Sequence, residues 1–154
     1  MNLQSIQSII DGENFTTSWE PATPEHPMDR LLVLLSEEKQ LLAELLFIPV
    51  EEEVENVHLL QFYVGLPGGV VAEAMSELRA FILRLNTTMP IGSFGIQEQQ
   101  ELLYFRYVLV IPQEEKPSAE IAIIQSMWLV FYLVESFADT IQAVAKGERL
   151  PSEV

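Results

Sequence analysis

The chain has 154 residues, of which 23 are acidic and eight are basic, so its formal net charge is −15 at pH 7. So large a negative charge disfavours binding to nucleic acids and to anionic membrane surfaces, and we expect neither as a partner. Yet 49% of the residues are hydrophobic and the mean hydropathy is positive, which favours a folded domain over a disordered chain.

The sequence contains no clear signal peptide or membrane-spanning segment. Residues 1–6 lack the basic and continuous apolar regions of a signal peptide. The longest apolar stretch, residues 121–134, contains Gln125 and Ser126 and is shorter than a bilayer span. The chain has no cysteine, which excludes disulfides and fits a reducing compartment. We therefore expect a cytoplasmic protein with a single domain over residues 1–154.

The chain begins with a short helix and an irregular segment. Apolar residues at helical spacing predict a helix over residues 2–10. Residues 11–29 contain three prolines, which predicts an irregular connection that Phe15 and Trp19 pin to the body of the domain.

Three apolar runs with polar turns between them come next, at residues 31–35, 41–50 and 57–66. Their lengths and punctuation favour strands in an antiparallel meander. The leucine-rich composition of residues 41–47 leaves a helix as the alternative there.

The second half of the chain predicts helix, hairpin and helix. An apolar stripe at helical spacing follows Pro67-Gly68-Gly69 and ends at Asn86. Residues 93–97 and 102–111 flank a four-residue polar loop, and pairing Gln97 with Leu102 places Gly95 opposite Tyr104. The last helix is predicted from Pro117 to about Lys146, and residues 147–154 are predicted to form a flexible tail.

Together these elements predict an α+β domain. Its five-stranded antiparallel sheet is flanked by helices in the chain order α-β-β-β-α-β-β-α.

This order, with residues 86–112, resembles the YbjN-like family of bacterial proteins, which are described as sensory-transduction regulators. The resembling features are Leu85-Asn86, then Gly92-Ser93-Phe94, a short polar loop, and Leu103-Tyr104-Phe105-Arg106 at the start of a long strand. The resemblance implies a fold like that of the type III secretion chaperones. It also implies a small, acidic, often dimeric protein that binds other proteins without catalysis, and it transfers no active-site residues.

One face of the predicted sheet suggests a binding surface. If the first turn pairs Leu35 with Gln40, Glu44 shares a face with Leu31 and Val33. Three mostly apolar strand faces are then each interrupted by one polar side chain, and these three side chains are Glu44, Gln61 and Arg106.

Two interpretations of this face remain open. In one, helices cover the uniformly apolar face and a protein partner binds the interrupted face, including Leu102, Tyr104, Arg106 and Val108. In the other, both faces are core and Arg106 pairs with a carboxylate such as Glu44.

The last helix carries a second hypothesis. It is apolar nearly all round, and Trp128, Phe131 and Tyr132 supply more apolar area than one small sheet easily covers. We expect a homodimer through this helix or a sheet edge; the alternative is a central helix buried within one subunit.

No motif points to catalysis. His26 and His58 are far apart and have no ligand spacing, so we expect no metal site, and no motif suggests a cofactor. The leading hypothesis is a non-catalytic protein-binding module, chaperone-like or regulatory, with apolar sheet and helix surface for its partner. The alternative is a domain that senses a small molecule in a pocket between the sheet and the last helix.

Overall fold

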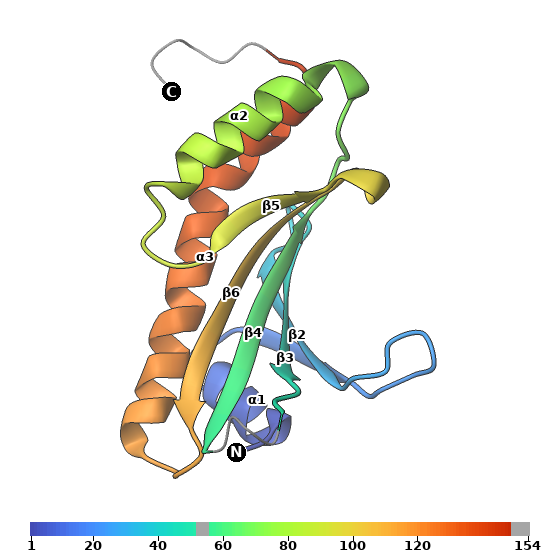
Figure 1. Ribbon diagram of the computed structural model, residues 1–154. Coiled ribbons are helices and arrows are strands. Elements are labelled where there is room, and N and C mark those ends of the chain that lie inside the picture. Colours follow the sequence, from blue (N-terminus) through green and yellow to red (C-terminus); the bar gives the residue numbers. More distant parts are fainter. Residues whose placement is uncertain (52–55, 149–154) are drawn as a thin grey trace.

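The computed structural model describes residues 1–51 and 56–148, which form a six-stranded antiparallel sheet with three α-helices on one face (Figure 1). The strand order across the sheet is β1-β2-β3-β4-β6-β5. The strands are β1 (Thr16–Glu20), β2 (Arg30–Ser36), β3 (Leu41–Ile48), β4 (Val57–Leu66), β5 (Ser93–Gln97) and β6 (Leu102–Pro112). The helices are α1 (Leu3–Asp11), α2 (Met75–Asn86) and α3 (Pro117–Ala145), with 3-10 turns η1 (Ala72–Ala74) and η2 (Glu98–Gln100).

The helix α3 is the main cover of the sheet. It contacts β4 and β6, and its buried Met127 and Val130 belong to the same core as Phe62 and Phe105 on those strands. By length and composition alone α3 could cross a membrane. The burial of its sheet-facing side in this core identifies it as the central helix of the fold.

The end of α3 is set by Gly147. This residue has a left-handed φ of 78°, and its N–H donates to the carbonyl of Val144 at 3.0 Å. The N–H of Glu148 donates to the carbonyl of Ala143, also at 3.0 Å. The predicted flexible tail therefore starts with two residues that close the helix, and its residues 149–154 lie outside the described part.

One strand contradicts the sequence prediction. Residues 16–20, inside the predicted irregular connection 11–29, form β1 at the edge of the sheet and place Trp19 opposite Leu31. An edge strand with a polar composition shows no clear apolar alternation, and all three prolines come after it, in the exposed loop 21–29. The sheet therefore has six strands rather than five, and the element order is α-β-β-β-β-α-β-β-α.

The register of β2 with β3 also corrects the prediction. Ser36 pairs with Leu41, a bulge follows, and Leu32 then lies opposite Glu44. Gln40 closes the turn with a left-handed φ of 55°, which a glutamine does not signal in advance. A slip of one residue moves every side chain to the other face, so Glu44 shares its face with Leu32 and Leu34, not with Leu31 and Val33.

Other predictions are confirmed. Gln97 pairs with Leu102, and Gly95 lies opposite Tyr104. Residues 41–47 lie in β3, so the strand interpretation holds there and the helix alternative is wrong.

Candidate functional site

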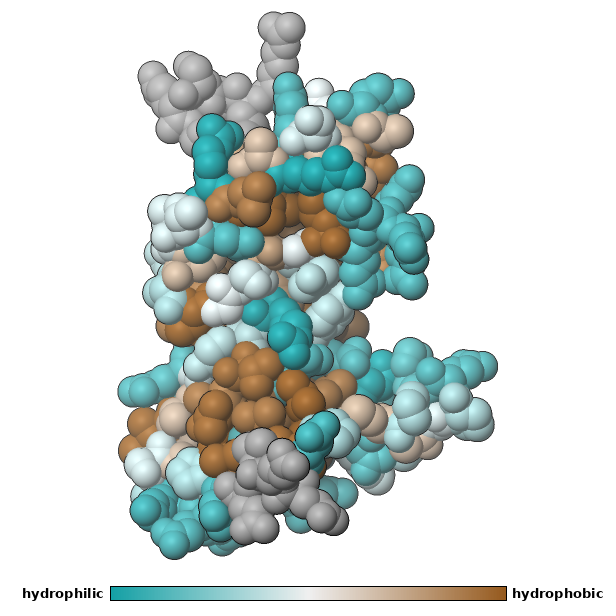
Figure 2. All heavy atoms as spheres, viewed as in Figure 1, coloured by the Kyte–Doolittle hydropathy of each residue, from teal (hydrophilic) through white to brown (hydrophobic). Residues whose placement is uncertain are grey.

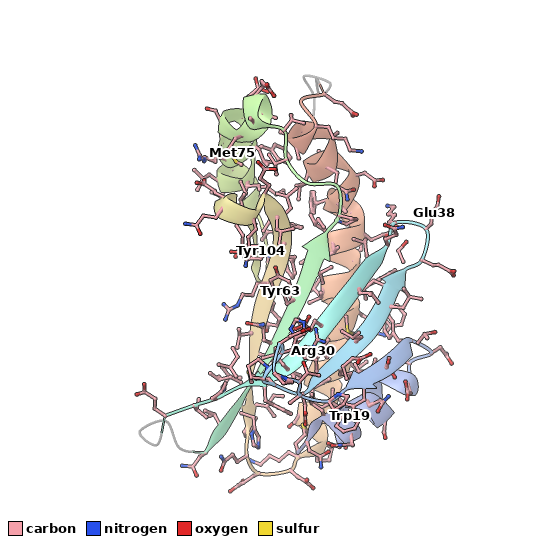
Figure 3. The ribbon with its side chains drawn as sticks, turned by 90° about the vertical axis from the view of Figure 1, so that its right-hand side faces the viewer. Trp19, Arg30, Glu38, Tyr63, Met75 and Tyr104 are labelled. Carbon is pink, nitrogen blue, oxygen red and sulfur yellow. The ribbon has the colours of Figure 1, made fainter. Side chains whose placement is uncertain are left out.

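The face of the sheet that points away from the helices is uncovered by any described element (Figure 3). Paired residues of antiparallel strands share a face, and every second residue of a strand returns to it. We call this surface the open sheet face. Its side chains on the four inner strands are Arg30, Leu32, Leu34, Leu42, Glu44, Leu46, Ile48, Leu59, Gln61, Tyr63, Leu102, Tyr104, Arg106, Val108 and Val110.

All six residues predicted to bind a partner lie on the open sheet face. Gln61 pairs with Val108 across β4 and β6, and Tyr63 connects Glu44 on β3 with Arg106 on β6. Tyr104 follows Arg106 by two residues on β6. Leu102 lies apart from this group, at the end of β6 and opposite Gln97 of the edge strand.

A row of polar side chains crosses the middle of the open sheet face. Glu44 forms an ion pair with Arg30, with Nη1 of the arginine and Oε2 of the glutamate 3.3 Å apart. Arg106 donates its Nε–H to Oε1 of Gln61 at 2.7 Å. The pairing of Arg106 with Glu44 that one interpretation required is absent among these side chains, because Tyr63 stands between the two strands. Glu44 is neutralised by its neighbour on β2 instead.

Apolar side chains lie on both sides of this polar row. One cluster consists of Leu32, Leu34 and Leu42, and the other consists of Leu46, Ile48, Leu59, Val108 and Val110. The side chain of Leu42 is 47% exposed and that of Val110 is 60% exposed. Apolar surface gathers over the lower ends of β4 and β6 in Figure 2. Sequence reasoning missed Leu32 and Leu34 because the assumed register turned them to the core.

Two tyrosines stack on the open sheet face. The rings of Tyr63 and Tyr104 are 5.4 Å apart and nearly parallel, and the Tyr104 ring lies over the bare backbone of Gly95 (Figure 3). Partial burial raises the pKa of the Tyr63 phenol, and the Tyr104 phenol and the Glu44 carboxylate add to the shift. Tyr63 was not predicted, although it follows Gln61 by two residues and so shares its face.

The open sheet face lacks a side chain at Gly65, and we call this gap the recess. This glycine pairs with Tyr104 on β6, and on its other side the β3–β4 ladder ends at Ala43 and Val64, one residue before Leu42 and Gly65. A Cβ at Gly65 would meet no atom within 4 Å. Its φ is not positive, so the backbone does not require glycine here. The missing side chain leaves an opening in an otherwise covered row.

The three predicted dimer residues lie on α3 but have different surroundings. The Trp128 ring packs 4.7 Å from Phe15 and donates its N–H to Glu13 at 3.1 Å, and Phe131 packs against both rings. Much of their apolar area is therefore covered within one chain. Tyr132 is 64% exposed and does not join this group.

The described residues leave little support for the alternative pocket. The space between α3 and the sheet is filled by side chains that have no exposed area, among them Phe62, Phe105 and Met127. A groove is found between α2 and α3 instead, lined by Phe81, Leu83, Arg84 and Val144. Over residues 1–51 and 56–148, no three His, Asp or Glu side chains come together as a metal site would require.

Comparisons with known proteins give a family and a fold. The model of the YbjN family, described as "Putative bacterial sensory transduction regulator", matches residues 42–143, from β3 into α3. The crystal structure of YbjN from E. coli, "a putative transcription regulator", has a TM-score of 0.54 with this chain and 16% identity. The match covers 98% of this chain and 97% of that one, and at such identity it shows the fold alone. No curated protein matches the chain.

Proposed function

Because the chain belongs to the YbjN family, we propose that it is a non-catalytic regulatory protein that acts by binding another protein through the open sheet face. The observation that carries this proposal is the uncovered apolar surface on both sides of the polar row. Exposed apolar surface that is contiguous and bordered by polar groups is typical of a protein interaction site.

The placement of charge supports the same proposal. The ion pair of Arg30 with Glu44 and the bond of Arg106 to Gln61 give each of these side chains a polar partner, while Nε of Arg30 is buried without one. A partner can therefore cover this centre without leaving a lone buried carboxylate. The acidic exterior would keep the complex soluble.

The likeness to type III secretion chaperones stays a prediction, for the fold as well as for the function. A chaperone-like role would mean that the face binds a partly folded or unstructured segment of the partner. The regulatory role would mean that the partner's activity depends on this contact. Both use the same surface.

A homodimer through α3 is a second part of the proposal. Ile121, Trp128 and Tyr132 lie on one stripe of the helix and are 54%, 42% and 64% exposed. Residues 121–134 carry no charge, and the carboxylate of Glu13 lies beside Trp128, whose N–H it accepts. Two copies of this acidic chain could therefore meet on a mostly apolar stripe. This dimer would leave the open sheet face free.

The test of the binding proposal uses one charge in each apolar cluster. The double variant Leu42→Asp/Val110→Asp replaces two exposed side chains, so its fold and thermal stability should be preserved. We expect it to lose the proteins that the full chain retains from a lysate of its source cells. Leu83→Asp, on α2 and 71% exposed, is the matched control and should retain them. Equal retention by the double variant and the unmodified chain would contradict the proposal.

A further inference from the structure

We propose that the element seated on the open sheet face is an amphipathic α-helix of the partner, with an apolar stripe flanked by Lys and Arg. This inference rests on the proposed function and specifies the class of its partner. It follows from what the sheet offers in hydrogen bonds, dimensions and charge.

Hydrogen bonding favours a helix over an added strand. The strands β2, β3 and β4 have a neighbouring strand on both sides, and so does β6 over residues 102–106, where β5 pairs with it. Beyond residue 106 the outer edge of β6 has no partner strand among the described residues. At the β5 edge, the Asn86 side chain donates to the Phe94 carbonyl and accepts from the Phe94 N–H, both at 2.9 Å. A segment lying across the face therefore meets side chains alone and must satisfy its own backbone, as a helix does.

Two strand edges remain, that of β1 and that of residues 107–112 of β6, and a strand added at either would leave part of the apolar surface uncovered. A strand added beside β1 would lie four strand spacings from β4, which is about 19 Å from the Gly65 recess. Such a strand would leave both apolar clusters uncovered. A strand added beside residues 107–112 of β6 would lie two strand spacings from β4, which is about 10 Å, so it would leave Leu42 and Gly65 uncovered. Only an element that crosses the face reaches the whole apolar area.

The dimensions of the clusters fit a helix of several turns. Tyr104 and Val110 mark the two ends of the apolar area on β6 and are six residues apart, which is about 20 Å along a strand. A helix covers this distance in about 13 residues. Side chains on one strand face repeat about every 6.6 Å, close to the helical rise of about 6 Å from residue i to i+4.

The recess at Gly65 provides a receptor for one large apolar side chain of that helix. Tyr104 pairs with the glycine on one side, Leu42 lies one residue beyond the end of the β3–β4 ladder on the other, and a Cβ at the glycine would meet no atom within 4 Å. A knob entering such a hole is the contact that fixes the register of a helix on a surface.

The negative charge around the open sheet face favours a partner helix with positively charged residues beside its apolar stripe. Glu38 lies at the turn after β2 (Figure 3), and Glu37 precedes it there. Glu51 follows β3, and Glu101 lies at the turn before β6. The loop 21–29 projects on the side away from the helices and carries further acidic residues (Figure 1). Arg106 is exposed at the centre, so cations of the partner belong beside its apolar stripe, not on it. A second copy of this chain would bring acidic rims together.

The experiment uses three synthetic peptides of about 18 residues, long enough to form a helix on binding. The first has leucines at i, i+3, i+4 and i+7 spacing and lysines elsewhere. The second has glutamates in place of the lysines, and the third has the composition of the first in an order without an apolar stripe. Isothermal titration calorimetry measures their Kd for the full chain at low and high salt.

We expect the first peptide to bind at least about tenfold more tightly than the other two, and to weaken as salt rises. Gly65→Val fills the recess without a steric conflict and suits a strand, so it should keep stability while weakening the first peptide by about tenfold. Ala80→Val adds bulk to the exposed side of α2 and should leave its Kd unchanged.

Three results would overturn the inference: no binding of the first peptide, equal binding of the second or third, or a Gly65→Val variant with unchanged Kd. The proposed function is judged separately. If the peptides fail while retention of cellular proteins still depends on Leu42 and Val110, the partner class is wrong and the binding function stands. If the Leu42→Asp/Val110→Asp variant also retains the cellular proteins as well as the unmodified chain does, both the partner class and the binding function are refuted.

Discussion

At the β5 edge of the sheet, the Asn86 side chain makes hydrogen bonds that the backbone of another strand would otherwise make. Its amide satisfies both backbone groups of Phe94, the two bonds that a neighbouring strand would make. These bonds join Leu85-Asn86 to Gly92-Ser93-Phe94, two of the sequence features that resemble the YbjN family. The Asn86 amide also occupies the backbone groups of Phe94, which another chain would need for pairing with β5 at this residue.

Replacing Asn86 should therefore destabilise the fold. Asn86→Ala leaves the half-buried N–H and carbonyl of Phe94 without partners, and we expect a loss of about 1–3 kcal/mol in the free energy of unfolding. Chemical denaturation measures it. Thr87→Ala removes an exposed hydroxyl from the next position, with its bond to the Arg84 carbonyl, and should cost less, about 0.5 kcal/mol. Similar values for the two variants would contradict the strand-like role of Asn86.

Tyr63 provides a residue-scale probe of the open sheet face. Its pKa is raised above the ordinary 10.0, mainly by burial, so the neutral phenol is favoured in the folded chain. Stability linked to Tyr63 is therefore fully present below pH 10.0 and is lost as the pH rises through the higher folded pKa. Absorbance at alkaline pH should show a late tyrosine step that Tyr63→Phe removes.

The charge of Glu44 contributes to this shift, so Glu44→Gln should move the late step toward 10.0. A bound partner should move it further upward, because it would exclude water from the phenol. A titration that Tyr63→Phe leaves unchanged would mean that Tyr63 is more solvated than its stacking on Tyr104 indicates.

At the scale of elements, the turn between β2 and β3 determines which leucines reach the open sheet face. Gln40 has the left-handed φ of 55° that completes this turn. Gln40→Gly should raise the free energy of unfolding by about 1 kcal/mol, because glycine adopts this conformation without the steric cost. Glu37→Gly, in the same turn without a positive φ, should not raise it. Stabilisation by Glu37→Gly alone would contradict this role of Gln40.

The β2–β3 turn also shows which features of the fold could not be predicted from the sequence. The β5–β6 hairpin was predicted in register because its polar loop was clear and because Gly95 and Tyr104 are complementary partners. The β2–β3 register was missed by one residue because nothing in a glutamine reveals its left-handed conformation. The six predicted binding residues nevertheless share one face, because five of them lie on β4 and β6, where the register was unaffected.

The edge strand was missed for a different reason. The residues of β1 are mostly polar, and their strand conformation depends on pairing with β2, a contact between segments that a local pattern does not record. Likewise, the contact of Phe15 with Trp128 joins residues that are far apart in the chain. It covers part of the surface that composition alone assigned to a dimer.

At the scale of the whole molecule, the uncharged stripe of α3 predicts a dimer. Analytical ultracentrifugation at micromolar concentration should give twice the 17.5 kDa of one chain. Tyr132→Glu would place a charge on the stripe, next to its own copy near the twofold axis, and should shift the population toward monomer. Leu83→Glu on α2 is the control. A monomer at all concentrations would refute the dimer and leave the open sheet face unaffected.

The central claim is that the open sheet face, and not α3 or the groove between α2 and α3, receives the protein partner. Methyl NMR of the full chain, with leucine and valine labelled, tests it most directly when spectra are recorded with and without the protein retained from its source cells. We predict that the largest shifts belong to Leu32, Leu34, Leu42, Leu46, Leu59, Val108 and Val110. Shifts confined to Leu83 and Val144, or to Leu129 on α3, with the face methyls unchanged, would contradict the claim.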